Sequence, residues 1–150
     1  MKLMNFCALI FSLILVVGCS SDDDSGSGGS NSPISGKSFG VNFTMQGGSA
    51  DEAVFFNVDS YTIQVSTVSL GCDAPQSSIV AEIICPSSLG VHTNNVYATF
   101  YDSEGDFQTI GTNNRVEITS NSGGRLKGKV NVPGLGSYNM TGTFDVPFCD

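Results

Sequence analysis

Few side chains in this 150-residue sequence could carry out catalysis. His92 is the single histidine. No serine or cysteine stands at a recognisable motif spacing from it, and hydrolysis usually needs a nucleophile, a base and a group that orients the base. The patterns Gly-x-Ser-x-Gly and His-Glu-x-x-His do not occur. A carboxylate pair could still assemble in space from Asp51, Glu52, Glu82 and Glu117. The sequence itself nominates no catalytic residue, and we expect a protein that is not an enzyme.

Metal ligands are equally sparse. A zinc site is disfavoured because there is one histidine and no pair of cysteines two residues apart. Asp102-Ser103-Glu104-Gly105-Asp106 places an acid at every second position, as a calcium loop does at its start. Phe107 and Asn113, however, occupy the sixth and twelfth positions, where such a loop needs glycine and a bidentate acid. The segment is therefore predicted to be a solvated hairpin turn, and no metal or other cofactor is expected.

The chain has five cysteines, of which Cys7 and Cys19 belong to the N-terminal segment described below. The remaining three are an odd number, so at most one intramolecular disulfide forms among them. Cys72 follows one predicted strand and Cys85 ends the next, which places the two at opposite ends of a hairpin. We therefore predict a disulfide between Cys85 and Cys149, which joins two strand ends.

Tyr97, Thr99 and Tyr101 share one face of a predicted strand, with the two rings about 13 Å apart along the strand. On an exposed face, Tyr97 and Tyr101 could stack on sugar units or on a partner surface. The alternative is cross-strand packing on a half-covered sheet. The absence of tryptophan weakens the case for a glycan.

Arg125, Lys127 and Lys129 form a basic stripe along another predicted strand, while Leu126 and Val130 point inward. The stripe is either a docking site for an acidic partner or simply a charged outer face of the sheet.

The elements that position these side chains are predicted to be strands, because apolar and polar residues alternate from Phe39 to the C-terminus without a helical period. The predicted strands are 39–45, 53–58, 61–68, 78–85, 96–101, 107–110, 115–119, 125–132 and a last one with Tyr138, Met140, Phe144, Val146 and Phe148 on one face. Strand 78–85 is apolar on both faces and should be central. Pro86 to Asn95 is the longest irregular loop. Eight or nine short strands predict an all-β fold, either an antiparallel β-sandwich or a partly closed barrel.

The N-terminus begins with Lys2 and an apolar run, 6–17, that is interrupted only by Ser12. A run shorter than the ~20 residues of a spanning helix predicts a cleaved signal sequence. The segment Val16-Val17-Gly18-Cys19 resembles the bacterial lipobox, although leucine is commonest where Val16 stands. The resemblance implies a signal peptide over 1–18, acylation of Cys19 and attachment to a membrane through that lipid.

Residues 19–36 are predicted to be a flexible tether, because residues 20–33 contain no large apolar side chain to bury. Ser20 directly after the cysteine resembles lipoproteins that reach the outer membrane. The run Ser20, Ser21, Asp22, Asp23, Asp24 resembles the export signal of surface-exposed lipoproteins in Bacteroidota. The alternative is a solvated acidic spacer. The resemblance implies an outer-membrane protein that faces the cell exterior.

Residues 79–149 resemble a group of small Bacteroidota lipoproteins in the pieces Ile118-Thr119-Ser120 and Gly142-Thr143-Phe144. This resemblance implies a β fold and an envelope location, and it implies no activity.

Loss of residues 1–18 would leave five basic and fourteen acidic residues, a net charge of −9, with three of the acids in the tether. That balance disfavours binding to nucleic acid and electrostatic attachment to anionic lipid. Residues 37–150 are enough for one domain with a single core.

The function expected from these features is non-enzymatic binding or scaffolding, with a protein or glycan of the cell envelope as ligand. The alternative is an inhibitor or immunity lipoprotein that blocks a partner enzyme, with the loop Pro86–Asn95 as the plug. A third class, an enzyme that degrades glycan or protein, has the least support in the sequence.

Overall fold

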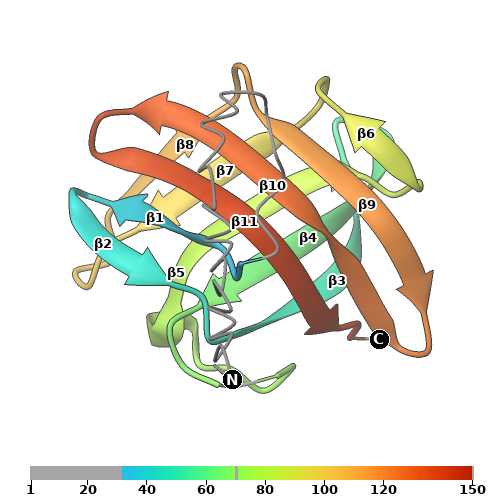
Figure 1. Ribbon diagram of the computed structural model, residues 1–150, viewed down its shortest axis with the longest axis horizontal. Helices are drawn as coiled ribbons and strands as arrows, with labels where there is room; N and C mark the ends of the chain where they lie inside the picture. The colour runs from blue at the N-terminus through green and yellow to red at the C-terminus, as the bar shows by residue number, and fades with distance from the viewer. Residues whose placement is uncertain (1–31, 70, 150) are drawn as a thin grey trace, which may run out of the picture.

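The computed structural model describes residues 32–69 and 71–149, which fold into two antiparallel β-sheets packed face to face (Figure 1). The predicted signal peptide, Cys19 and the acidic run behind it lie outside the described residues. In the described ranges, no helix is long and apolar enough to cross a membrane. The predicted antiparallel β-sandwich is confirmed.

The larger sheet has six strands in the order β2-β1-β11-β10-β9-β6, and the smaller has five in the order β3-β4-β5-β7-β8. The strands are β1 Ser35–Ser38, β2 Val41–Thr44, β3 Gly47–Phe55, β4 Val58–Ser66, β5 Ile79–Pro86, β6 Gly90–His92, β7 Tyr97–Tyr101, β8 Phe107–Ile110, β9 Arg115–Ser122, β10 Arg125–Leu135 and β11 Tyr138–Pro147. A short 3-10 helix, η1 (Gln76–Ser78), precedes β5. The described part of the chain therefore forms eleven strands, where eight or nine were expected.

The first predicted strand, 39–45, is in fact part of a hairpin. Phe39 and Gly40 form its turn, with φ of 48° and 80°, and β2 runs back along β1. Two positive φ values in a two-residue turn match the twist of antiparallel strands. The folded domain also begins earlier than the expected boundary at residue 37, since Ile34 is fully buried.

The other added strand is β6, inside the segment predicted to be an irregular loop. Gly90 to His92 pair with Ile118 to Val116 at the edge of the six-stranded sheet. A strand of three residues is too short to show an alternation in the sequence. It forms because its backbone pairs with β9.

The core lies between the sheets, where strands from both layers contribute alternate side chains. β5 is central as predicted, with Ala81 and Ile83 fully buried and Ile84 half-buried on the other face. The largest fully buried side chains include Ile63, Ile83, Phe100, Leu126 and Met140. Each contributes roughly 1.5–3 kcal/mol relative to an exposed position, so these inward positions hold the two layers together.

The predicted disulfide is wrong in one partner: Cys149 is bonded to Cys72, with 5.8 Å between their Cα atoms. Cys149 lies at the free edge of β3, where its backbone N–H donates to the carbonyl of Ala50 at 2.7 Å. Cys85 lies on β5, with β4 between it and β3, and its side chain points into the core. Bridged cysteines need Cα atoms within about 7 Å, and an interior strand position does not allow that approach to Cys149.

Cys85 is therefore a free, buried thiol. Burial raises its pKa to about 12. Since the thiolate is the reactive species, this cysteine is held in its inert form.

Candidate functional site

The outward side of the five-stranded sheet carries the side chains best suited to hold a ligand. We call this surface the aromatic face. It consists of an aromatic cluster at one end, a polar row across the middle and a second aromatic pair at the other end. Its residues are Phe55, Phe56, Tyr97, Gln64, Glu82, Thr99, Thr109, Tyr101 and Phe107.

The aromatic cluster brings the rings of the neighbouring residues Phe55 and Phe56 together with Tyr97, which comes from a distant part of the chain. Phe55 ends β3, Phe56 begins the turn into β4, and Tyr97 begins β7. The Phe55 ring centroid lies 5.2 Å from that of Tyr97 and 4.5 Å from that of Phe56, and the Phe56 and Tyr97 centroids are 6.0 Å apart. Edge-to-face and tilted contacts of this kind are favourable between rings and leave part of each π face free.

The backbone at Phe56 is held in an unfavourable conformation. Phe56 and Asn57 form a two-residue hairpin turn with φ of 49° and 59°. Such turns favour Asn, Asp or Gly at the first position, and a bulky residue there is an outlier. Phe39 has the same conformation, but its ring packs 5.1 Å from Tyr138 in an edge-to-face contact that joins β11. Phe56 keeps 74% of its surface exposed, so burial does not explain its presence at a strained position.

The polar row crosses four strands in register. Gln64, Glu82, Thr99 and Thr109 are successive cross-strand neighbours. Ser49 Oγ donates a hydrogen bond to Gln64 Oε1 at 3.1 Å, and the Thr99 and Thr109 hydroxyls are 3.0 Å apart. The row therefore presents amide, hydroxyl and carboxyl groups side by side.

Glu82 is the electrostatic centre of this face. Burial, and secondarily the charge of Asp51, raises the pKa of its carboxyl above the ordinary 4.5. The pKa of Tyr101 is raised by burial first and then by the charge of Glu82. The chain has no lysine or arginine between Lys37 and Arg115, so no cation extends from any strand of this sheet.

Replacing Glu82 with glutamine is expected to stabilise the fold at neutral pH. Because the folded protein holds this proton more tightly than the unfolded chain, stability falls as the pH rises from 4.5 through the raised pKa. Glu82→Gln removes that penalty. Urea unfolding should show a gain for the variant near neutral pH that disappears below the unfolded-state pKa. A gain that grows at acid pH would contradict the assignment, and Glu117→Gln on the other sheet is the control.

The predicted ligand residues Tyr97 and Tyr101 do lie on one face of β7, and both are half-buried. Tyr97 packs against the aromatic cluster and also over Gly111, where an added side chain would meet the ring at 3.2 Å. Tyr101 lies opposite Phe107, which is 68% exposed.

The four nominated carboxylates do not converge. Asp51 and Glu82 share the aromatic face, whereas Glu117 lies on the six-stranded sheet opposite Lys129. Glu52 lines a groove of about 360 Å³ together with Asp59. Asp59 was not among the nominated carboxylates, because its place beside this groove depends on the register of the β3–β4 hairpin, and that register depends on where the turn falls.

His92 lies in β6, where its Nε2 is 2.8 Å from the carbonyl oxygen of Ser88. This contact fixes the ring against its own loop. The segment 102–106 is a hairpin turn as predicted, since Asp102 Oδ1 accepts hydrogen bonds from the backbone N–H groups of Glu104 and Asp106, both at 2.9 Å. Across the part of the chain that the structure describes, no group of three or more potential ligands gathers to hold a metal ion.

Phe55 and Phe56 were not predicted as site residues, because the strand predicted over 53–58 included both of them. The turn has no glycine to mark it, so the only signal is the Asn57 that follows two aromatic residues.

Comparison of the chain with protein-family models, with curated proteins and with solved structures found no match.

Proposed function

We propose that this protein is a lipid-anchored, non-enzymatic binding protein of the outer membrane that faces the cell exterior and holds a neutral glycan chain on its aromatic face. The observation that carries the proposal is the exposed Phe56 ring, kept beside Tyr97 at a strained backbone position. Strained residues concentrate at binding and catalytic sites, where the surrounding fold offsets their cost.

The location rests on the N-terminal sequence. Cys19 in its lipobox-like setting supports acylation, and Ser20 to Asp24 support export to the surface. Both features lie outside the described residues.

The chemical class of the ligand rests on the layout of the aromatic face. Tyr97 and Tyr101 are four residues apart on one strand, a distance of about 13 Å that matches a few sugar units. Rings pack against the C–H faces of sugars, and the polar row between them offers partners for hydroxyl groups. Glu82 and Asp51, with no cation nearby, disfavour acidic glycans.

The test is binding of a panel of oligosaccharides to cells that display the full chain. The panel contains cello-, xylo-, manno- and laminari-oligosaccharides, with oligogalacturonate as the acidic member. We expect at least one neutral member to bind and the acidic member not to bind. Replacing Phe56 and Tyr97 with serine should weaken that binding about tenfold or more, as loss of central aromatic contacts does.

The matched control is Leu135→Ser, because Leu135 is 79% exposed but belongs to the six-stranded sheet. Protease treatment of intact cells checks display in the same samples. Binding that survives the double replacement, or that falls equally with Leu135→Ser, would remove the aromatic face from the proposal.

A second candidate, an inhibitor of a partner enzyme, is favoured by one feature of the loop Pro86–Asn95. Leu89 is 66% exposed and directly precedes the paired strand β6. An apolar side chain presented on a stiffened loop is suited to fill a cleft. Inhibition of an envelope hydrolase that is lost with Leu89→Asp and retained with Phe56→Ser would favour this function over glycan binding.

A further inference from the structure

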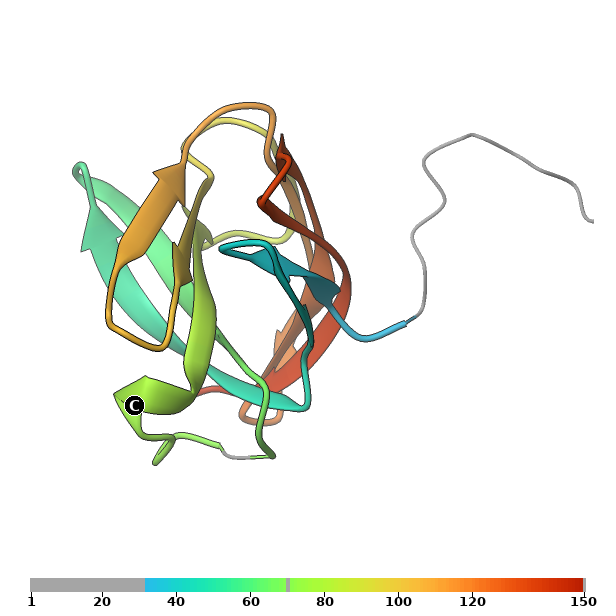
Figure 2. The same ribbon diagram turned by 90° about the vertical axis from the view of Figure 1, so that its left-hand side faces the viewer.

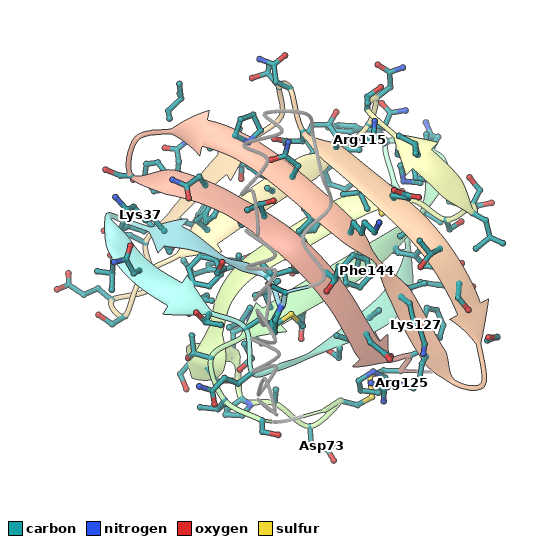
Figure 3. All side chains as sticks on the ribbon, in the orientation of Figure 1. Lys37, Asp73, Arg115, Arg125, Lys127 and Phe144 are labelled. Carbon is teal, nitrogen blue, oxygen red and sulfur yellow. A yellow bond between two sulfur atoms is a disulfide. The ribbon has the colours of Figure 1, made fainter. Side chains whose placement is uncertain are left out.

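The outward side of the six-stranded sheet, which we call the basic face, carries every lysine and arginine of the described residues. These are Lys37, Arg115, Arg125, Lys127 and Lys129. The first four are labelled in Figure 3. The pairing register places them on the same side, because Lys37 lies opposite Asn139, Arg115 opposite Asn131, and Lys127 opposite Asp145. The buried residues Leu126 and Val130 alternate with the cations of β10.

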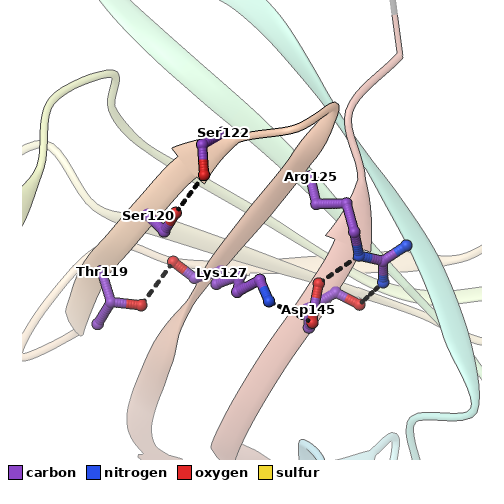
Figure 4. A network of polar contacts seen from close by, with 6 residues as sticks. All are labelled: Thr119, Ser120, Ser122, Arg125, Lys127 and Asp145. Carbon is purple, nitrogen blue, oxygen red and sulfur yellow. Dashed lines mark hydrogen bonds and ion pairs between the residues drawn. The ribbon is translucent and has the colours of Figure 1, made fainter.

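Only part of this positive charge is neutralised locally. Arg125 Nε and Lys127 Nζ both contact Asp145, at 2.5 and 3.0 Å (Figure 4). The hydrogen bonds from Arg125 and then Lys127 lower the pKa of Asp145, which therefore stays ionised. Within the described ranges, Lys37, Arg115 and Lys129 form no ion pair. Among the described residues, the one other acid on this face is Glu117, opposite Lys129.

The remaining acids of the described chain belong to the five-stranded sheet and its connections. They are Asp51, Glu52, Asp59, Asp73, Glu82, Asp102, Glu104 and Asp106. The two layers of the sandwich therefore carry opposite charge. The net charge of the chain is strongly negative, but the basic face of the described residues carries five cations and two carboxylates.

The described chain also begins on the basic face. The carbonyl of Ser32 accepts hydrogen bonds from the backbone N–H of Thr143 at 2.8 Å and from its hydroxyl at 3.0 Å. Thr143 is on β11, directly opposite Lys129. Figure 2 shows the start of the described chain on the outer side of the six-stranded sheet, away from the five-stranded sheet. Cys19 is thirteen residues earlier in the chain, a reach of at most about 45 Å.

We infer that the basic face docks on the anionic headgroups of the membrane that holds the lipid. The inference rests on the proposed acylation of Cys19. The lipid and the short connection keep the domain at high effective concentration beside the bilayer, so weak contacts suffice. Each Lys or Arg near an anionic surface strengthens association about fivefold. Docking in this orientation turns the aromatic face away from the membrane, toward its ligand.

The test places a spin label on each face of the full, acylated protein in vesicles. The label is attached to a cysteine that replaces Thr141 on the basic face or Thr109 on the aromatic face. Both are exposed threonines on strands. Cys85 does not take up label because it is buried. Vesicles of phosphatidylcholine alone are compared with vesicles that also contain phosphatidylglycerol.

We expect the label at Thr141 to lose accessibility to a water-soluble relaxing agent severalfold on the anionic vesicles only, and the label at Thr109 to keep it. About 1 M salt should abolish the protection, because the screening length falls to about 3 Å. Arg115→Glu with Lys129→Glu should also abolish it. The control, Glu104→Lys with Asp106→Lys, makes two charge reversals in the turn between β7 and β8 of the other sheet and should leave the protection unchanged.

Equal accessibility of Thr141 on both kinds of vesicle would overturn docking. If the protein still sedimented with the vesicles in that case, the proposed lipid anchor would be supported without docking. A Cys19 without lipid by mass spectrometry would overturn both. Protection that appears on neutral vesicles and is lost on replacing Asp22–Asp24 with asparagine would assign the basic face to the chain's own acidic segment and overturn membrane docking.

Discussion

Replacing Cys72 and Cys149 with serine is expected to lower the free energy of unfolding by about 4 kcal/mol. The two cysteines are 77 residues apart, so the bridge removes a large amount of chain entropy from the unfolded state. It also secures the end of the chain after β11 against the free edge of β3, where Phe148 and Ala50 form an isolated bridge. Urea unfolding followed by circular dichroism measures the difference.

The control for this experiment is Cys85→Ser, which removes a cysteine and leaves the disulfide in place. Reduction of the native protein should reproduce the loss seen in the double variant and should leave that variant itself unchanged. A loss below about 1 kcal/mol in the double variant would mean that the contacts between β3 and the C-terminal segment hold this edge without the bridge.

Truncating Phe100 to alanine is expected to cost about 3–5 kcal/mol of unfolding free energy. Phe100 is fully buried on β7, and its ring centroid lies 5.8 Å from that of Tyr138 on β11. The side chain therefore joins the two sheets, and the space it leaves cannot be filled by neighbours without repacking. Chemical denaturation of the purified variant measures the loss.

Phe107 provides the matched control, because it is the same residue type on the neighbouring strand β8 but is 68% exposed. Phe107→Ala should change stability by no more than about 0.5 kcal/mol. The pair also separates folding from binding: Phe107 belongs to the aromatic face, so its truncation should weaken glycan binding in a protein of native stability. Equal losses of stability for the two variants would contradict the assignment of Phe100 to the core and of Phe107 to the exposed face.

The alternation of apolar and polar residues was enough to predict the antiparallel sandwich and the longer strands. β5 illustrates why: Ala81 and Ile83 fill the core while Val80 and Ile84 are half-buried on the other face, and a central strand needs both. The hairpin turn at Phe39-Gly40 was missed, and the turn between β3 and β4 was predicted later in the chain than its actual position at Phe56-Asn57. Both turns begin with an aromatic residue that local preference does not place there. At Phe39, packing of the ring against Tyr138 on β11 offsets the cost of the turn, whereas Phe56 stays exposed and has no compensation from burial.

The aromatic face was predictable only in part. Tyr97 and Tyr101 share a face by simple period two, and the sequence identifies them. Phe55 and Phe56 lie at the end of β3, and Tyr97 lies on β7, with β4 and β5 between these strands in the sheet. Their rings meet only because of the register in which the four strands pair, and no local pattern specifies that register. The predicted disulfide was wrong for the same reason. Strand order, rather than spacing along the chain, separates Cys85 from Cys149 and brings Cys72 close to Cys149.

The sequence by itself determined the fold class, the expectation of a lipid at Cys19 and a net negative charge, because each depends on local pattern or on composition. Net charge led to the interpretation that anionic surfaces would be avoided. Only the tertiary structure decided where the charges lie: pairing of β1, β9, β10 and β11 places all described cations on one outward face, and the other sheet carries none. Fields near a surface depend on this distribution and not on the total, so a chain rich in acids still presents a positive side.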